Sequence, residues 1–231
     1  MCLSPEASFA VGGALIPVGG YCLWSALRKK PNAWGLAVVP LGFGVQQISE
    51  GFVWLGIQAH DPDRTHAAAL AYLFFALAFW PFWFPFMAAL SEADRKRKWI
   101  LGVTSLIACT WFWVLFFPLL GDPGALKIDV VHHSIQYDIW SLPIYSHGGA
   151  SRPIVKLIYL LSLAAPFVLS SDRGGWIPGV LLGLSVVAAE LAYHHAFISV
   201  WCFLAAVMTS YIGWMFYRLP WPSELSREKP G

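Results

Sequence analysis

The sequence predicts an all-α membrane protein, a polytopic bundle of about seven transmembrane helices with a short β-hairpin in one outer loop. Hydrophobic residues make up 58% of the 231 residues and charged residues only 12%, about half the charged share of an ordinary soluble domain. Long apolar stretches recur, and the main ones have the roughly 20 residues that a helix needs to cross the hydrocarbon core. We therefore expect the lipid bilayer as a partner, and neither a soluble fold nor a nucleic-acid partner.

The expected spans are separated by short polar breaks. Arg28-Lys29-Lys30 follows the first span, Asp61-Pro62-Asp63 the second, and the charged run 91–98 the third. Because residues 1–6 contain no Lys or Arg, a cleaved signal peptide is not expected and the first span should stay in the mature chain. The predicted spans are residues 7–26, 34–57, 67–90, 99–120, 153–170, 176–194 and 196–217.

Two of these spans need a further argument. No Gly or Pro separates the last two, yet a single helix over 176–217 would be about 63 Å long, twice the thickness of the hydrocarbon core. We therefore predict a tight turn near His194-His195. In the third span, Pro81 and Pro85 are expected to kink the helix.

The basic residues predict the orientation, because cytoplasmic loops and tails retain Lys and Arg. With the N-terminus outside and the C-terminus in the cytoplasm, eleven of the fifteen basic residues fall on the cytoplasmic side. We therefore expect a multi-pass protein of the cell inner membrane, formed as a single domain over residues 1–231 with a cytoplasmic tail at 218–231. The outer side keeps Arg64, Lys127, Arg152 and Lys156.

The one long connection, residues 121–152, then lies outside. Its centre, residues 127–139, is rich in β-branched residues and partly alternating, which favours a short hairpin over the end of the bundle. A connection of this length typically serves as a lid or a binding loop. All seven histidines fall on this outer side: His60, His66, His132, His133, His147, His194 and His195. This distribution suggests metal binding or proton exchange. The alternative is that the outer loops simply contain more polar residues than the short inner ones.

Glu50 is the most informative residue inside the spans, because a charge at membrane depth costs several kcal/mol unless it is paired or solvated. It lies about 10 Å below the outer end of its helix by helical rise. Gln46 and Trp54 stand at i−4 and i+4 and therefore share its face. This face is expected to turn inward and bind a ligand. The alternative is that Glu50 only joins two helices through a hydrogen bond.

Glu190, near the outer end of the sixth span, is the second such acid. With His194 at i+4 it can form a hydrogen-bonded pair or supply two ligands of one metal ion. Alternatively, it reaches water at the membrane surface with His194 as its salt partner. In the last span His195, Ser199 and Cys202 lie along one face. We expect Glu190 and Ser199 to join Glu50 in one pocket, and Glu190, His194, His195 and Cys202 to be candidate metal ligands.

Cys2 and Cys202 both lie on the outer side. An oxidising exterior favours a disulfide that ties the N-terminus to the last helix. Metal ligation by Cys202 and an inert buried thiol are the alternatives. Because no CxxC or HExxH spacing is present, no known metal motif decides among them.

Three segments carry a resemblance. The opening Met1-Cys2-Leu3-Ser4, the second-span segment 46–54 and the last-span segment 197–206 are similar to an uncharacterised bacterial membrane-protein family whose members begin Met-Cys-Phe-Ser. Leu3 departs from that opening. The resemblance covers the chain from end to end and implies the membrane fold, but it transfers no activity.

The leading hypothesis is an outward-facing polar pocket that binds a small molecule, a proton or a metal ion, as in a transporter or receptor. The alternative is a zinc-dependent membrane hydrolase acting on a lipid-like substrate at the outer leaflet, with zinc activating a water. Haem ligation by histidines and a purely structural role are further alternatives. Whether the protein is an enzyme stays open at this point.

Overall fold

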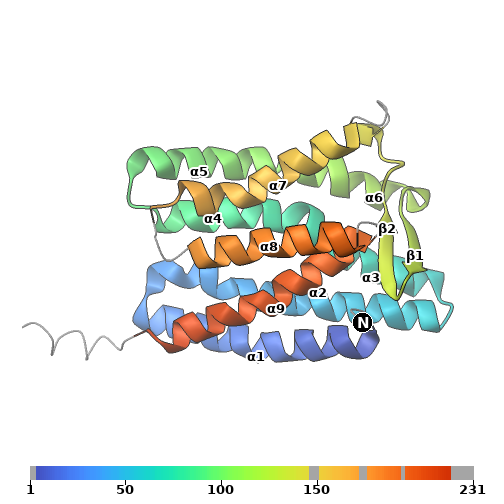
Figure 1. The fold of residues 1–231 in the computed structure, drawn as a ribbon, viewed down its shortest axis with the longest axis horizontal. Helices are drawn as coiled ribbons and strands as arrows, with labels where there is room; N and C mark the ends of the chain where they lie inside the picture. The colour runs from blue at the N-terminus through green and yellow to red at the C-terminus, as the bar shows by residue number, and fades with distance from the viewer. Residues whose placement is uncertain (1–3, 146–150, 172–175, 194–195, 220–231) are drawn as a thin grey trace, which may run out of the picture.

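The computed structural model describes residues 4–145, 151–171, 176–193 and 196–219. These residues form a bundle of long helices lying side by side, closed at one end by a β-hairpin (Figure 1). The helices are α1 (Pro5–Lys29), α2 (Trp34–Gln58), α3 (Pro62–Leu73), α4 (Trp80–Ser91), α5 (Arg95–Ala108), α6 (Phe117–Gly121), α7 (Ser151–Leu169), α8 (Trp176–Tyr193) and α9 (Phe197–Tyr217), and short 3-10 turns lie at Pro31–Ala33, Pro123–Ala125 and Pro143–Tyr145.

Within the described residues, six helices are long and apolar enough to cross a membrane. Two of the six are composite, because α3 and α4 form one rod over Pro62–Ser91, and α5 and α6 form another over Arg95–Gly121. The outer faces of the spans carry exposed apolar side chains, such as Leu106 of α5 at 70% and Val168 of α7 at 79% exposure, which only a lipid environment accommodates without cost. The prediction of a multi-pass helical membrane protein is confirmed. The sixth predicted span corresponds to α8, whose apolar part, Gly179–Leu191, is shorter, so the count of seven stays a prediction.

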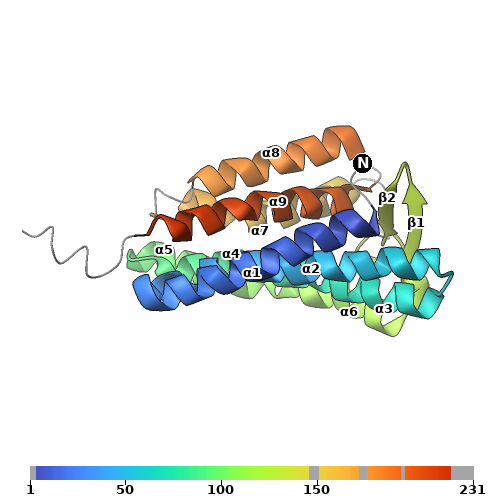
Figure 2. The same cartoon turned by 90° about the horizontal axis from the view of Figure 1, so that it is seen from below.

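The helices pack in an order that determines what can meet in the interior. Helix α1 packs along α2, α4 along α5, and α8 along α9, while α9 also contacts both α1 and α2. Figure 2 shows α8 on the outside of the bundle, with α9 between it and the α1–α2 pair. Side chains of α8 are therefore separated from α2 by a whole helix.

The α1–α2 contact depends on glycines that let the two backbones approach. A Cβ on Gly12 would lie 2.9 Å from the Gly44 carbonyl oxygen, and a Cβ on Gly44 would lie 3.2 Å from that of Gly12. A Cβ on Gly19 would lie 2.5 Å from the backbone nitrogen of Leu41. Small residues at such positions let transmembrane helices gain close van der Waals contact. This contact fixes the position of α2, on which the candidate site is built.

The rods α3–α4 and α5–α6 each contain a widened, π-helical turn, at Phe74–Phe79 and Phe112–Phe116 respectively. Each turn ends shortly before a proline, Pro81 or Pro118, which lacks the N–H that a regular helical hydrogen bond needs. In the third predicted span the helix has a widened turn that ends before Pro81, while Pro85 lies inside α4; the kink expected at these two prolines stays a prediction. The carbonyl of Ala76, inside the first widened turn, accepts a hydrogen bond from the Tyr159 hydroxyl of α7.

The predicted hairpin is confirmed. Strands β1 (Lys127–Val131) and β2 (Ser134–Asp138) pair antiparallel, with Val131 opposite Ser134. The two turn residues, His132 and His133, both have left-handed backbones with φ of 49° and 59°, the requirement of the tight turn that suits strand twist. Strand β2 packs against α9 and lies across the bundle end where α2 and α8 finish and α9 begins (Figure 1).

Candidate functional site

One face of α2 carries polar side chains into the interior of the bundle. Gln46, Gln47 and Glu50 are each 0% exposed and Trp54 is 7% exposed. They fall at i, i+1, i+4 and i+8, which places them on one side of a helix. Ser49 is oriented differently, since its hydroxyl donates to the Val45 carbonyl of its own helix. The inward face predicted around Glu50 is therefore present.

Helix α9 supplies the direct partner of the acid. The Ser199 hydroxyl, in the first turn of α9, donates a hydrogen bond of 2.5 Å to Glu50 Oε1. Ser199 is itself 0% exposed. The second carboxyl oxygen, Oε2, has no hydrogen-bond partner among the residues that the structure describes.

Further buried polar atoms near the hairpin end of the bundle also lack hydrogen-bond partners within the described part of the chain. They are Nε2 of Gln46, both amide atoms of Gln47, Nε1 of Trp54 and the hydroxyls of Ser8, Ser134 and Tyr137. The Gln47 amide lies close to the Glu50 carboxyl, but neither of its atoms makes a hydrogen bond of normal geometry. Buried polar atoms are almost always hydrogen-bonded, so such a group of exceptions needs a physical explanation.

Tyr72 of α3 and Tyr137 of the hairpin lie next to these polar side chains. Their rings stack with centroids 5.0 Å apart, and the Tyr72 hydroxyl donates to the Ile198 carbonyl over 3.2 Å. Burial raises the pKa of Tyr137 well above its usual value, and the nearby Glu50 and Cys202 side chains raise it further. The Tyr137 phenol therefore keeps its proton and can donate it in a hydrogen bond. The Cys202 thiol, 1% exposed, lies beside Tyr72 and Gln46.

Trp80 of α4 fixes the orientation of the Gln46 side chain. Its indole Nε1 donates a hydrogen bond of 2.7 Å to Oε1 of Gln46, and its ring stacks on Phe43 with centroids 4.1 Å apart. Gly42 leaves room for this ring, since a Cβ there would lie 2.7 Å from Trp80. The Gln46 amide is thereby fixed with its nitrogen left over for another acceptor. We call Gln46, Gln47, Glu50, Trp54, Tyr72, Tyr137, Ser199 and Cys202 the Glu50 cluster.

The comparison with protein families decides to which group this chain belongs. A model described as a family of unknown function, DUF6629, matches residues 1–223. The chain belongs to that family. No curated protein and no solved structure matches it. The resemblance to an uncharacterised family is thus confirmed, and membership in DUF6629 adds no activity to the geometry described above.

In this DUF6629 chain, the predicted meeting of Glu50 and Glu190 does not occur. The Glu190 side chain is 45% exposed and forms an ion pair with Lys156 of α7, whose ammonium lies 3.8 Å from the centre of the Phe197 ring. Glu50 is buried against Ser199 instead. The physical reason is the position of α8 outside α9. Glu190 therefore reaches the surface, as the alternative interpretation held, with Lys156 as its salt partner.

The predicted metal ligands are likewise not brought together within the described ranges. His194 and His195 lie outside the residues that the structure describes, and Cys202 is buried in the Glu50 cluster, away from the exposed Glu190. Among the described residues, no group of three or more His, Cys, Asp or Glu side chains gathers. Cys202 forms no disulfide with another described residue, and Cys2 precedes the described residues, so the Cys2–Cys202 disulfide stays a prediction.

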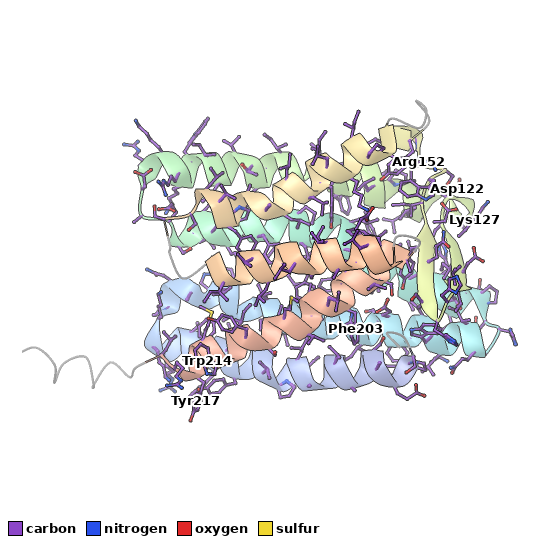
Figure 3. All side chains as sticks on the ribbon, in the orientation of Figure 1. Asp122, Lys127, Arg152, Phe203, Trp214 and Tyr217 are labelled. Carbon is purple, nitrogen blue, oxygen red and sulfur yellow. The ribbon has the colours of Figure 1, made fainter. Side chains whose placement is uncertain are left out.

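Charged and aromatic side chains surround the hairpin end. Figure 3 shows Asp122, Lys127 and Arg152 at this end and Trp214 and Tyr217 at the opposite one. The Arg152 guanidinium lies 4.8 Å from the centre of the Trp140 ring. The His60 side chain and the two histidines of the hairpin turn are exposed here as well.

Sequence reasoning missed Tyr72, Tyr137 and Trp80 as members or neighbours of this site. Tyr137 reaches Glu50 only through the folding of a hairpin over the bundle end, which no helical spacing reveals. Tyr72 and Trp80 flank the widened turn Phe74–Phe79, which changes the helical register between them. Their position in an aromatic-rich segment concealed a polar role.

Proposed function

We propose that this membrane protein binds a small polar molecule or a proton in the Glu50 cluster, under the hairpin. The observation that supports this most directly is that Oε2 of the fully buried Glu50 and several neighbouring buried polar atoms have no hydrogen-bond partner among the described residues. A buried polar group without a hydrogen bond costs on the order of 1–3 kcal/mol by mutational measures. Several in one place favour an occupant that hydrogen-bonds to them.

A purely structural role accounts less well for this arrangement. A carboxyl that only joins two helices would need Ser199 and one further donor, and the rest of the cluster would be apolar. Instead, donors predominate among the unpartnered atoms: the Gln46 and Gln47 amide nitrogens, the Trp54 indole and the Tyr137 hydroxyl. The occupant they favour is therefore rich in acceptor oxygens, with the Glu50 carboxyl receiving or releasing a proton.

The approach to the cluster is proposed to be from outside the cell, with the hairpin as its cover. Basic residues at the opposite end of the bundle, namely Arg28 to Lys30 and Arg95 to Lys98, support a cytoplasmic location for that end. The proposal includes α8 as a seventh span, with the C-terminus in the cytoplasm and the bilayer as the cell inner membrane. The N-terminus of α1 then lies outside, near the hairpin.

The zinc-hydrolase alternative gains no support from the part of the chain that the structure describes. Catalytic zinc is held by three protein ligands and one water. Within those ranges, the only carboxyl in the Glu50 cluster is Glu50 itself, beside a single thiol, and Glu190 is paired with Lys156. A binding role is therefore the better-supported hypothesis.

The test compares wild type with Glu50→Gln, using Glu190→Gln as the matched control because it removes an exposed acid at the same end. Small molecules released on denaturing the purified proteins are identified by mass spectrometry, and the carboxyl band is followed by infrared spectroscopy against pH. We expect a released polar molecule or a titrating buried carboxyl in wild type and Glu190→Gln, and neither in Glu50→Gln. Identical results for all three proteins would refute the proposal.

A further inference from the structure

We propose that a crevice whose mouth lies at the basic end of the bundle, opposite the hairpin, binds an anionic membrane lipid. Its headgroup would lie at a polar mouth between the helix ends and an acyl chain would lie between α7, α8 and α9. We call this region the lipid crevice. It consists of a mouth, a narrow neck and an apolar arm, which are described in turn.

The mouth is a cavity of about 460 Å³ between the beginning of α2, the α4–α5 turn and the ends of α7 and α9. This volume falls within the range of small-molecule sites. The polar lining is concentrated here: Lys30, Asn32, Ser91, Glu92, Ser170 and Ser171. A charged or hydrogen-bonding headgroup would find its partners at this level.

Positive charge prevails around the mouth among the described residues. Lys30 lines it, the Lys29 ammonium donates to the Leu219 carbonyl over 3.0 Å, and Arg97 Nη1 lies 3.2 Å from the Ser171 hydroxyl. The one acid in the lining, Glu92, already accepts the N–H groups of Ser171 at 2.7 Å and Asp94 at 3.0 Å. A phosphate or other anionic headgroup therefore matches the electrostatics of the mouth, and a cationic one does not.

The mouth, the neck and the arm share lining residues, above all Phe167. It lines the mouth, a small apolar neck of about 50 Å³ and the apolar arm alike. Leu36 and Met87 are shared by mouth and neck, and Leu182 by neck and arm. The three spaces are thus adjacent, and the neck and the arm are both far less polar than the mouth.

The arm is a space of about 420 Å³ between α7, α8 and α9, lined by apolar side chains from Leu160 to Val168, from Gly179 to Val186, and by Trp201. Two of its lining residues, Val168 and Val180, are 79% and 50% exposed, so it opens sideways, on the face that the bilayer would cover. A water-soluble phosphate compound would fill only the mouth. An amphiphile with one charged end and a hydrocarbon chain fits the whole crevice.

The test reconstitutes the full chain in nanodiscs of phosphatidylglycerol or phosphatidylcholine and counts retained lipid by native mass spectrometry. Gly183→Leu adds a side chain at a residue that lines the arm, and a Cβ on Gly183 meets nothing within 4 Å. Gly20→Leu is its matched control, because Gly20 on α1 is equally open and does not line the crevice. Lys30→Gln removes the protein cation that would pair with the lipid headgroup. Lys96→Gln is its control, because it removes an exposed cation at the same end of the bundle.

We expect wild type to retain phosphatidylglycerol over phosphatidylcholine, and Lys30→Gln to weaken this retention about five-fold, the effect of one cation near a membrane surface. Gly183→Leu should abolish retention, while both controls resemble wild type. Equal retention of the two lipids, or equal losses in the controls, would overturn the proposal. So would binding that appears only after deletion of residues 220–231, because the chain's own tail would then be the occupant.

Discussion

The Ser199 hydroxyl of α9 donates a hydrogen bond of 2.5 Å to the Glu50 carboxyl of α2, and both side chains are 0% exposed. This bond connects residues far apart in the chain at the level of the hairpin. It uses only one of the two carboxyl oxygens. The other oxygen faces a group of polar atoms whose partners are not supplied by the described part of the chain.

Replacing Ser199 by Ala is expected to destabilise the fold, because Glu50 Oε1 would lose its buried donor. The expected loss is about 1 kcal/mol in the free energy of unfolding, in line with buried hydrogen bonds within membranes. Thermal unfolding in detergent measures it. In Glu50→Gln the same Ser199→Ala change should cost less, since the amide is neutral. Ser210→Ala is the control, because the Ser210 hydroxyl is exposed on the same helix; an equal loss there would contradict the account.

The contact of α1 with α2 is expected to respond sharply to one of two neighbouring glycines. A Cβ on Gly19 would lie 2.5 Å from backbone of α2, whereas a Cβ on Gly20 would meet nothing within 4 Å. Gly19→Ala should therefore destabilise the protein by about 1–3 kcal/mol, the usual cost of overpacking. Gly20→Ala should be neutral or slightly stabilising, because alanine favours helix. Chemical unfolding of both variants checks this, and equal stabilities would be the contrary result.

Glu92 should make the stability depend on pH. Hydrogen bonds from the backbone N–H groups of Ser171 and Asp94 lower the pKa of Glu92 from 4.5 to about 2. Since the folded pKa lies below the unfolded one, the stabilisation is present above about pH 5 and is lost as the pH falls towards 2. Glu92→Gln should therefore lower the free energy of unfolding by on the order of 1–2 kcal/mol at neutral pH, and this difference from wild type should shrink as the pH falls. Unfolding both proteins across this pH range measures the difference. A gap independent of pH, or one matched by the exposed-acid control Asp129→Asn, would contradict this.

The hairpin turn should be strained by its histidines. His132 and His133 adopt φ of 49° and 59°, a region in which Asn and Gly cost less. The double change His132→Asn and His133→Gly is expected to slow amide hydrogen exchange in β1 and β2, consistent with roughly 1 kcal/mol of relief. The same pair of changes at the exposed, helical residues Lys96 and Lys98 should not protect the hairpin. Faster exchange in β1 and β2 of the turn variant would contradict the prediction, because it would show that the two histidines stabilise the hairpin.

The sequence predicted the membrane class, the positions of the helices and the hairpin, because apolar length, basic clusters and alternation are local properties. It also predicted the inward face of α2, since Gln46, Glu50 and Trp54 recur at helical spacing. It could not reveal which helix meets that face. The expectation that Glu190 meets Glu50 failed because equal depth in the membrane does not reveal that α9 lies between α8 and α2. Tyr137 was unpredictable because only tertiary folding of the hairpin brings it over Glu50.

The most direct test of the central claim is an experimental structure of the protein in lipid nanodiscs, at a resolution that shows ordered water. We predict non-protein density within hydrogen-bonding distance of Glu50 Oε2, bridging it to the Gln47 amide or to Tyr137. A Glu50 carboxyl whose second oxygen instead bonds directly to a protein group, with the surrounding amides and hydroxyls paired among themselves, would contradict the account.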